Sequence, residues 1–356
     1  MRYQEMTRTT IDDVAKLAGV SIKTVSRVVN REPNVRPATR DKVDQAIAQL
    51  NYRPNLSARS LASQRSHLIV LVYDDPDQYE VPSSGYVIRM QQGALRACRR
   101  EHCELLIHPC RSRDGGNGNE LRSLVEQVRP DGVILAAPLS HMSDLVEAIT
   151  QTGTPLVRLS PGIEVDGEFS VATDDREICA EMTCYLARLG HRRIAFIAGN
   201  PGHRAVGNRL AGYREGLQQS AIPFAPELVA TGDNSLESGE AATQSLLALD
   251  EPPTAIFAAN DDMAAGALRV AARLGLRVPS DLSVAGFDDG ALARFVYPAL
   301  TTIRQPLARM AERAARALIS AASGAPLPAR TEIVLSTLVT RDSTAAPRNL
   351  EHAQRT

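Results

Sequence analysis

The residues of this sequence that could do chemistry are polar side chains placed where short apolar runs end. Arg209 begins a helical segment after the run RIAFIAG, and other runs end in carboxylate, hydroxyl and amide side chains: Asp74, Asp75, Ser160, Asn260 and Asp288. A guanidinium or a carboxylate can each hold two adjacent hydroxyls, and amides add single hydrogen bonds. These residue types favour a polyhydroxylated small molecule as ligand. Structural roles stay open for two of them, because Asn260 can cap the following helix and Asp288 can cap a turn.

A second group of polar residues lies near the N-terminus and suits DNA. Residues 10–30 predict a helix, a turn containing Gly19 and a second helix, which together are typical of a helix-turn-helix. In that motif the second helix enters the major groove with its N-terminal end. Its exposed start would supply the contacts: Ile22, Lys23 and Arg27 to bases, and Ser21 and Thr24 to phosphates. A three-helix protein-interaction module with incidental charge is the alternative.

Charge is unevenly distributed along the chain, although the formal net charge is only −1. Residues 1–66 carry 12 Lys and Arg against 6 Asp and Glu, whereas the other 290 residues carry 28 against 35. A basic N-terminal part on an acidic remainder is typical of a module that binds a polyanion, most often nucleic acid. The charge distribution therefore favours the DNA-binding interpretation.

Catalytic chemistry has no support in the motifs of the sequence. None of the three lysines follows a glycine, so no G-x-x-x-x-G-K-[ST] phosphate loop exists, and G-x-G-x-x-G, G-x-S-x-G and H-E-x-x-H are missing too. Five cysteines without a C-x-x-C pair are interpreted as reduced thiols packed like small hydrophobic side chains, rather than as a zinc or redox site. We therefore expect no enzyme, no cofactor and no metal site.

Local signals define the helices that must position the DNA-contacting residues. Thr10 and Asp13 have the spacing of a capping box, Gly19 ends the first helix, Ser21 caps the second, and Pro37 suits the first turn of a third. Apolar residues then recur at helical spacing: Val14, Leu17 and Ala18; Val25, Val28 and Val29; Val43, Ile47 and Leu50. The polar segment 51–66 is interpreted as a linker.

Beyond residue 67, short apolar runs alternate with amphipathic helical segments. The predicted strands are LIVLVYDD (68–75), CELLIHPC (103–110), DGVILAAP (131–138), PLVRLS (155–160), RRIAFIAG (192–199), TAIFAAN (254–260) and SVAGFDD (283–289). Continuous apolar strands between helices indicate parallel sheets covered on both faces. The succession starts afresh near residue 170, which predicts an α/β body of two doubly wound lobes. Ligands of such sheets bind at the carboxyl ends of the strands, where the polar residues above fall.

Targeting and membrane signals are missing from the sequence. No stretch approaches the ~18 unbroken apolar residues of a membrane span, and the N-terminal residues show neither the apolar region nor the cleavage site of a secretory signal. These observations predict a cytoplasmic protein.

Residues 10–30, TIDDVAKLAGVSIKTVSRVVN, resemble the DNA-binding head of the LacI/GalR family of bacterial transcription regulators. The signature V-S-x-x-T-V-S-R-V-x-N is intact as Val20 to Asn30. The resemblance continues through LNYRPN, ARSLAS, LGHRRIAFIAG, NRLAGY, AIFAANDDMAAGAL and PALTTIRQP, and covers residues 10 to 341. It implies a helix-turn-helix domain on a periplasmic-binding-protein-like body, and a homodimer that binds near-palindromic operator DNA.

The resemblance also assigns roles to DNA-contacting residues. Ile22 and Lys23 would read the operator sequence, and Arg27 would make a shared base or phosphate contact. The linker corresponds to a hinge helix that orders on specific DNA, with Leu61 as a wedge in the minor groove at the centre of the palindrome. The remaining positions carried over are Asn30, Asn55 and Ala58.

For the ligand, the resemblance places Arg209 and Asp288 at positions that grip the effector, with Asn260 and Gln305 at further pocket positions. Purine-responsive members carry Arg and Thr where this chain has His203 and Ala205. A sugar or glycoside is therefore favoured, although no Trp is present for stacking. The aromatic residues that could replace it are Tyr73, Phe257 and Phe287.

These observations together predict a repressor that a small sugar or glycoside releases from its operator by closing the two lobes. A corepressor-dependent regulator that answers a non-sugar metabolite stays open, and so does a transporter-type sugar-binding protein, which residues 1–66 argue against. The predicted organisation is a helix-turn-helix domain at 1–53, a hinge at 54–66, a body at 67–341 and a tail at 342–356. The body is expected to form lobes of about 67–169 plus 299–328 and 170–298 plus 329–341.

Overall fold

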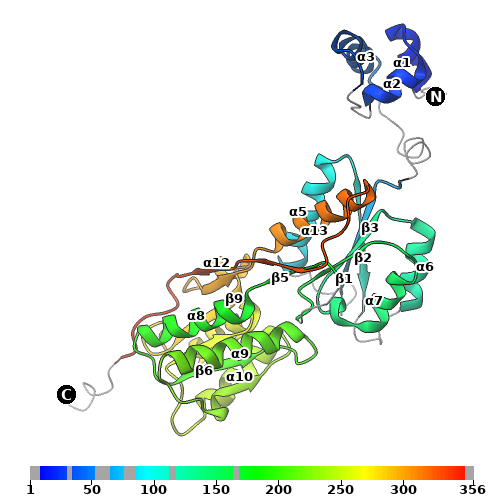
Figure 1. Cartoon of the computed structure of the whole chain (residues 1–356). Helices are drawn as coiled ribbons and strands as arrows, with labels where there is room; N and C mark the ends of the chain where they lie inside the picture. Colours follow the sequence, from blue (N-terminus) through cyan, green and yellow to red (C-terminus); the bar gives the residue numbers. More distant parts are fainter. Residues whose placement is uncertain are drawn as a thin grey trace, which may run out of the picture. The chain divides into compact units, whose positions relative to one another are not determined.

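The computed structural model describes residues 9–29, 34–52, 65–75, 85–111, 118–162 and 168–348. The chain divides into two compact units, Met1–His67 and Leu68–Thr356. Figure 1 shows the first as a helical unit and the second as two sheets covered by helices. No helix among the described residues is long and apolar enough to cross a membrane.

The N-terminal unit contains three described helices, α1 (Ile11–Ala18), α2 (Ile22–Val29) and α3 (Pro37–Gln49). The predicted capping box is confirmed, because Thr10 Oγ1 accepts a hydrogen bond from the Asp13 amide and Asp13 accepts one from the Thr10 amide. Gly19 ends α1 with φ +65°, a left-handed conformation that favours glycine. The core of this unit is made by the valines that the pattern predicted to be buried: Val14, Val25, Val28 and Val43.

One apolar residue of α1 was assigned to the wrong face. Leu17 is 45% exposed instead of belonging to the core. The buried stripe consists of Ile11, Val14, Ala15 and Ala18, which occupy the i, i+3, i+4 and i+7 positions of one helix face. At the ~100° per residue of an α-helix, Leu17 lies about 110° from the centre of this face, whereas the four residues of the stripe lie within about 50° of it.

The first lobe is built on a six-stranded parallel sheet with the order β11-β5-β4-β3-β1-β2. Its strands are β1 (Leu68–Asp74), β2 (Glu104–Cys110), β3 (Gly132–Leu135), β4 (Leu156–Leu159), β5 (Ser170–Thr173) and β11 (Thr331–Val334). Alternate residues of β1 serve opposite faces: Ile69 and Leu71 pack with α5 (Gly85–Arg100) and α13 (Leu307–Ala322). Val70 and Val72 pack with α6 (Gly118–Val128) and α7 (Ser143–Thr150). Both faces are thus covered, as the unbroken apolar runs predicted.

The second lobe is built on a sheet with the order β12-β10-β9-β8-β6-β7, parallel except for β12. Its strands are β6 (Ile194–Ala198), β7 (Val229–Thr231), β8 (Ala255–Ala258), β9 (Ser283–Asp288), β10 (Thr301–Arg304) and β12 (Thr337–Val339). Its helices are α8 (Asp175–Arg188), α9 (Arg204–Gln219), α10 (Leu236–Leu247), α11 (Asp261–Arg273) and α12 (Leu292–Phe295). The helices pack in pairs, α8 with α9 and α10 with α11.

The predicted lobe boundaries differ from the sheet pairing and are corrected by it. Residues 170–173 and 331–334 form β5 and β11 of the first sheet, not parts of the second lobe. Residues 301–304 form β10 of the second sheet, not part of the first lobe. These strands are short and lack a long apolar run, so only their backbone pairing assigns them.

The segment predicted as a tail is also partly structured. Ser343 is fully buried and donates a hydrogen bond to the Val284 carbonyl, 2.6 Å away. The Ala345 amide donates to Ser283 Oγ at 3.1 Å. The second lobe therefore continues beyond residue 341, because the chain returns to the start of β9.

Gly93 permits the close packing of two helices in the first lobe. A Cβ atom at this position would lie 1.9 Å from the Ala308 carbonyl oxygen of α13. No side chain fits at that distance, so α5 and α13 can pack this closely only with glycine at position 93.

Candidate functional site

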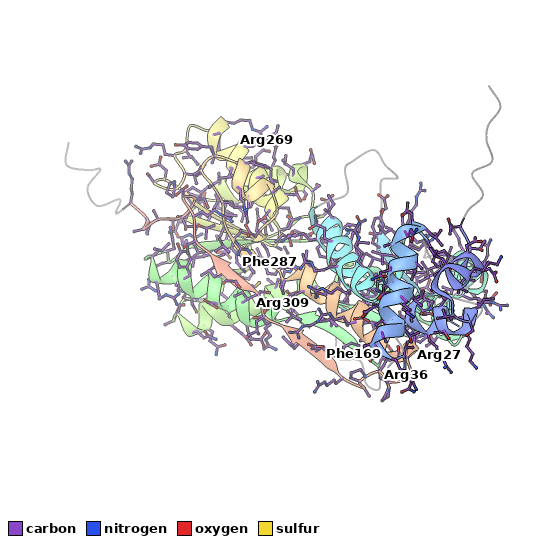
Figure 2. The ribbon with its side chains drawn as sticks, turned by 90° about the horizontal axis from the view of Figure 1, so that it is seen from above. Arg27, Arg36, Phe169, Arg269, Phe287 and Arg309 are labelled. Carbon is purple, nitrogen blue, oxygen red and sulfur yellow. The ribbon has the colours of Figure 1, made fainter. Side chains whose placement is uncertain are left out.

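Arg209 lies on α9 and contacts α8, β9 and the residue that follows β8. Its Nη1 donates a hydrogen bond to the Ala259 carbonyl at 2.7 Å, and its Nε lies 3.6 Å from Asp175 Oδ2. The guanidinium carbon lies 3.8 Å from the centroid of the buried Phe287 ring, which Figure 2 labels. The Nε atom itself is buried without a hydrogen-bond partner among the described residues. Arg209 is therefore held in place by a backbone carbonyl, a carboxylate and an aromatic ring.

Asp175 is a site residue that the sequence analysis missed. It begins α8, its side chain is 6% exposed, and its Oδ1 accepts a hydrogen bond from Thr173 Oγ1 at 2.6 Å. Burial raises the pKa of its carboxyl group, and the nearby Arg209 guanidinium opposes that rise. The sequence identifies Asp175 only as an acidic residue in the first turn of a helix. The strand that precedes it, β5, was not predicted.

Asp288 ends β9 and joins the two lobes. Its φ of +120° is a conformation that side chains rarely adopt, which is a strain found most often at functional sites. Its Oδ1 accepts a hydrogen bond from Gln305 Nε2 at 2.5 Å, and its backbone carbonyl accepts one from Arg89 Nη2 at 2.8 Å. Arg89 belongs to α5 of the first lobe, so this bond connects the lobes. The structure thus brings the predicted pair Asp288 and Gln305 together.

Tyr86 is a second residue of α5, in the first lobe, that interacts with the same group of side chains. Burial raises the pKa of its phenol, and the charges that act on it are Arg209, Asp288 and Asp175. The lobes approach each other closely at a second place, because a Cβ on Gly162 would lie 2.5 Å from the Arg204 Cβ atom of α9. The body is therefore seen with its lobes in contact around Arg209, Asp175, Asp288 and Tyr86, which we call the interlobe group.

The other predicted ligand residues have mixed surroundings. Asn260 caps α11, since its Oδ1 accepts from the Met263 amide at 2.9 Å, and its Nδ2 donates to the Asn234 carbonyl at 2.8 Å. Its amide is thus already used in structural hydrogen bonds. Ser160 follows β4, with φ +48° and a buried Oγ that has no hydrogen-bond partner among the described residues. Asp74 ends β1 and is half-buried.

The aromatic residues proposed as stacking platforms are all buried. Phe257 packs edge-on against Phe196 in the core, and Phe287 lies beneath Arg209. Tyr73 is 9% exposed and belongs to the core of the first lobe. A ligand between the lobes would therefore meet Arg209 rather than the face of Phe287.

The predicted DNA-contacting residues lie on the face of α2 opposite its core valines. Ser21, Ile22, Lys23 and Arg27 are exposed and Thr24 is half-buried, whereas Val25 and Val28 of the same helix are buried. Ser21 Oγ accepts a hydrogen bond from the Thr24 amide at 3.2 Å, which confirms the predicted helix cap. The other predicted contacts, Asn30, Asn55, Ala58 and Leu61, lie outside the described residues.

Comparisons with known proteins cover both units. Residues 10–55 match the family model "Bacterial regulatory proteins, lacI family", and residues 183–344 match "Periplasmic binding protein-like domain". The probable HTH-type transcriptional repressor ExuR of Bacillus subtilis is 34% identical over 334 residues, which span 94% of this chain and 98% of that protein. The regulator GalR of Escherichia coli is 36% identical over 348 residues, 95% and 96% of the two chains.

Two solved structures are similar over nearly the whole chain. The complex of the transcriptional regulator CelR with cellobiose has a TM-score of 0.72 at 32% identity, covering 94% of this chain and 100% of that one. The lac repressor dimer bound to operator and the anti-inducer ONPF has a TM-score of 0.73 at 29% identity, covering 96% and 100%. Sequence and structure comparisons therefore agree over both units.

Proposed function

The chain belongs to the lacI family of bacterial regulatory proteins, and we propose that it is a transcriptional repressor that a sugar or glycoside releases from its operator. The observation that carries the ligand half of this proposal is the interlobe group. It consists of a guanidinium, two carboxylates and a phenol where the lobes meet. Such groups bind the hydroxyls of a sugar, and the related CelR structure contains cellobiose.

In this mechanism, the effector changes the balance between two arrangements of the lobes. Arg209, Asp175 and Asp288 belong to the second lobe and Tyr86 and Arg89 to the first, so a ligand held by both sets favours the arrangement with lobes in contact. Effector and operator then affect each other's affinity by the same factor, typically about 5- to 150-fold. We propose repression without effector and release with it. The protein would act in the cytoplasm, where operator DNA is found, and without catalysing a reaction.

The test combines selection of operator DNA with a ligand screen. The full chain is used to select binding sites from random duplexes, and its melting temperature is measured with monosaccharides, disaccharides, glycosides and purines. Ligands that raise the melting temperature are then added to the operator complex. We expect a near-palindromic site and release by a sugar. Absence of sequence preference would contradict the repressor assignment, and stabilisation by a non-sugar that strengthens DNA binding would favour a corepressor mechanism.

We further propose that two chains associate through an aromatic surface of the second lobe. Phe295 and Tyr297 are 83% and 96% exposed, far more than aromatic side chains usually are in an isolated domain. A two-fold symmetric operator requires two copies of the head, and the related lac repressor was solved as a dimer. A second copy of this chain is therefore the partner proposed for this surface.

Replacing both aromatic residues, Phe295→Ser with Tyr297→Ser, should weaken the dimer by at least ~30-fold, because buried aromatic anchors are worth about 2 kcal/mol or more. Sedimentation at several protein concentrations measures the dissociation constant. Leu274→Ser is the matched control, since Leu274 is also an exposed apolar residue of this lobe, at 60%. Equal dimer stability in the aromatic double variant and the control would exclude this surface.

Effector affinity should fall in mild acid because of Asp288. Burial raises the pKa of this carboxyl group to about 6, against the lowering effect of Arg209 and Arg89. The ionised carboxylate is the form that accepts hydrogen bonds from two hydroxyls, so protonation removes an acceptor. From pH 7 to pH 5 we expect roughly tenfold weaker effector binding, as the ionised fraction falls by about that factor. Calorimetric titration measures it, and Asp288→Asn should bind weakly with a flatter pH profile.

A further inference from the structure

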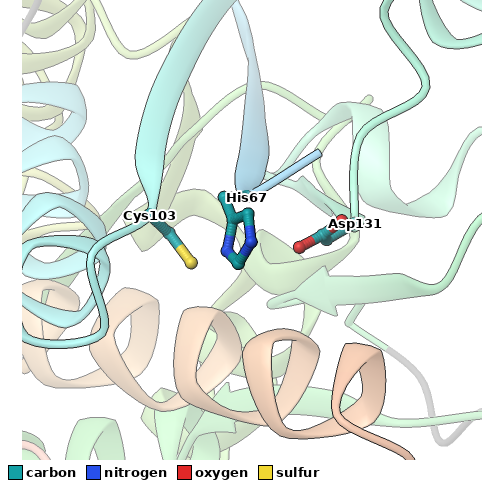
Figure 3. A group of neighbouring side chains, drawn as sticks. All are labelled: His67, Cys103 and Asp131. Carbon is teal, nitrogen blue, oxygen red and sulfur yellow. The ribbon is translucent and has the colours of Figure 1, made fainter. Parts of the chain in front are cut away.

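Three side chains of metal-binding type meet at the edge of the first sheet that is remote from the interlobe group. Figure 3 shows them: His67, Cys103 and Asp131. His67 directly precedes β1, whereas Asp74 at the other end of β1 is one of the predicted ligand residues. Seven strand residues at about 3.3 Å each separate these ends by roughly 20 Å. The cluster is therefore independent of the proposed effector site.

The register of three adjacent parallel strands brings these residues together. Leu68 of β1 pairs with Glu104 of β2, so His67 and Cys103 occupy neighbouring positions just before their strands. Ile69 pairs with Gly132 of β3, and the Asp131 amide donates to the Leu68 carbonyl at 2.8 Å. The potential ligand atoms of the three side chains all lie within 4.8 Å of one another.

Burial and backbone conformation support a built site. His67 and Cys103 are 7% and 4% exposed, which is unusual for a histidine. His67 also has φ +53°, a left-handed conformation that costs energy in a residue other than glycine. In Figure 3 its ring lies between the Cys103 sulfur and the Asp131 carboxylate. The polar groups of this edge therefore converge on one place in the sheet.

We propose that His67, Cys103 and Asp131 bind one transition-metal ion of the zinc class. Zn²⁺ takes imidazole nitrogen, thiolate and carboxylate ligands, whereas Mg²⁺ and Ca²⁺ prefer oxygen alone. The thiolate and the carboxylate together carry two negative charges, which balance a divalent ion in a buried place. Three protein ligands leave a fourth position of a tetrahedron for water. This proposal departs from the expectation that every cysteine is only a small hydrophobic side chain.

The position of the ion suggests what it would do. His67, Cys103 and Asp131 directly precede β1, β2 and β3 of the first sheet. A metal ion would attach the start of β1 to the amino ends of β2 and β3. It would thereby hold the amino ends of these three strands together and stabilise the protein as any ligand of the folded state does.

The test uses the full chain, reduced and freed of metal by a chelator, with Co²⁺ as a spectroscopic probe. We expect one equivalent to bind, with the visible bands of a tetrahedral site and a thiolate-to-cobalt charge-transfer band, and Zn²⁺ to displace it. Cys103→Ser should lose the charge-transfer band. His67→Gln and Asp131→Asn should each weaken binding by more than ~100-fold, because loss of outer-shell partners alone costs 10- to 100-fold.

Two matched variants control for general effects. Cys184→Ser changes the half-exposed cysteine of α8, and His108→Gln changes a half-buried histidine within β2; both should bind Co²⁺ like the unaltered chain. Melting curves of the metal-free proteins show whether each variant folds. If Cys103→Ser does not fold, Asp131→Asn still tests the site. Absence of a charge-transfer band in the unaltered chain would show a metal-free hydrogen-bonded triad. Its persistence in Cys103→Ser would place the ion elsewhere, and either result overturns the proposal.

Discussion

Operator binding should weaken about 10⁴-fold when the monovalent salt concentration rises from 50 to 200 mM. The N-terminal 66 residues carry twice as many basic as acidic side chains, and Lys23 and Arg27 of α2 are exposed. If each subunit neutralises ~4 phosphates, a dimer releases about eight counterions, and the log–log slope is roughly −7. Binding curves on the selected operator at four or more salt concentrations measure this slope.

Variants that each remove one charge show whether the salt dependence of operator binding comes from the N-terminal unit. Arg27→Ala should reduce the steepness by about one or two per dimer if its guanidinium contacts phosphate. Lys23→Ala should instead lower the preference for operator over random DNA, since a base-reading lysine gives specificity. Arg269→Ala removes the same charge from α11 of the body, at an exposed side chain, and should change neither quantity. A slope near zero in the unaltered chain would contradict DNA binding by the helix-turn-helix.

Arg209→Ala should abolish the response to effector and also destabilise the protein by about 3 kcal/mol. The loss of response follows from the position of Arg209 in the interlobe group, where its guanidinium lies beside Asp175 and over Phe287 at the place where the lobes meet. The loss of stability follows from Asp175, whose side chain is 6% exposed and would keep its buried carboxylate without the guanidinium beside it. Breaking a buried pair by removing one partner typically costs 3–5 kcal/mol, and the lower end suits the 3.6 Å separation of Nε and Oδ2.

A double variant separates the two effects of Arg209. Arg209→Ala with Asp175→Ala should regain part of the stability, because no unpaired buried charge remains, and should still fail to release operator. Asp288→Asn should fail to respond while melting near the temperature of the unaltered chain, since an amide keeps the size of the side chain and an oxygen for Gln305. Denaturant unfolding and effector titration of the operator complex give both quantities. An Arg209→Ala protein that has the free energy of unfolding of the unaltered chain and releases operator at the usual effector concentration would show that the ligand binds elsewhere.

The sequence by itself determined the features whose partners are close along the chain. The capping box of Thr10 and Asp13, the left-handed Gly19 and the cap at Ser21 depend on interactions between residues at most four positions apart. The runs that form β1, β6, β8 and β9 are apolar at their central positions because both faces of each strand are buried there, so composition alone identified them. The signature from Val20 to Asn30 added the family and, with it, the prediction that the exposed face of α2 contacts DNA.

Features that depend on the pairing of segments separated along the chain were decided only by the tertiary structure. The short strands β5, β10 and β11 carry no strong apolar signal, and the lobe to which each belongs follows only from its backbone pairing. Tyr86 and Asp175 join Arg209 and Asp288 because α5 and α8 begin near the carboxyl end of β9, a juxtaposition that no local pattern encodes. His67, Cys103 and Asp131 likewise meet only because β3, β1 and β2 are neighbours in register. Periodicity reports which face of an element is buried, whereas the pairing of distant segments decides what lies against that face.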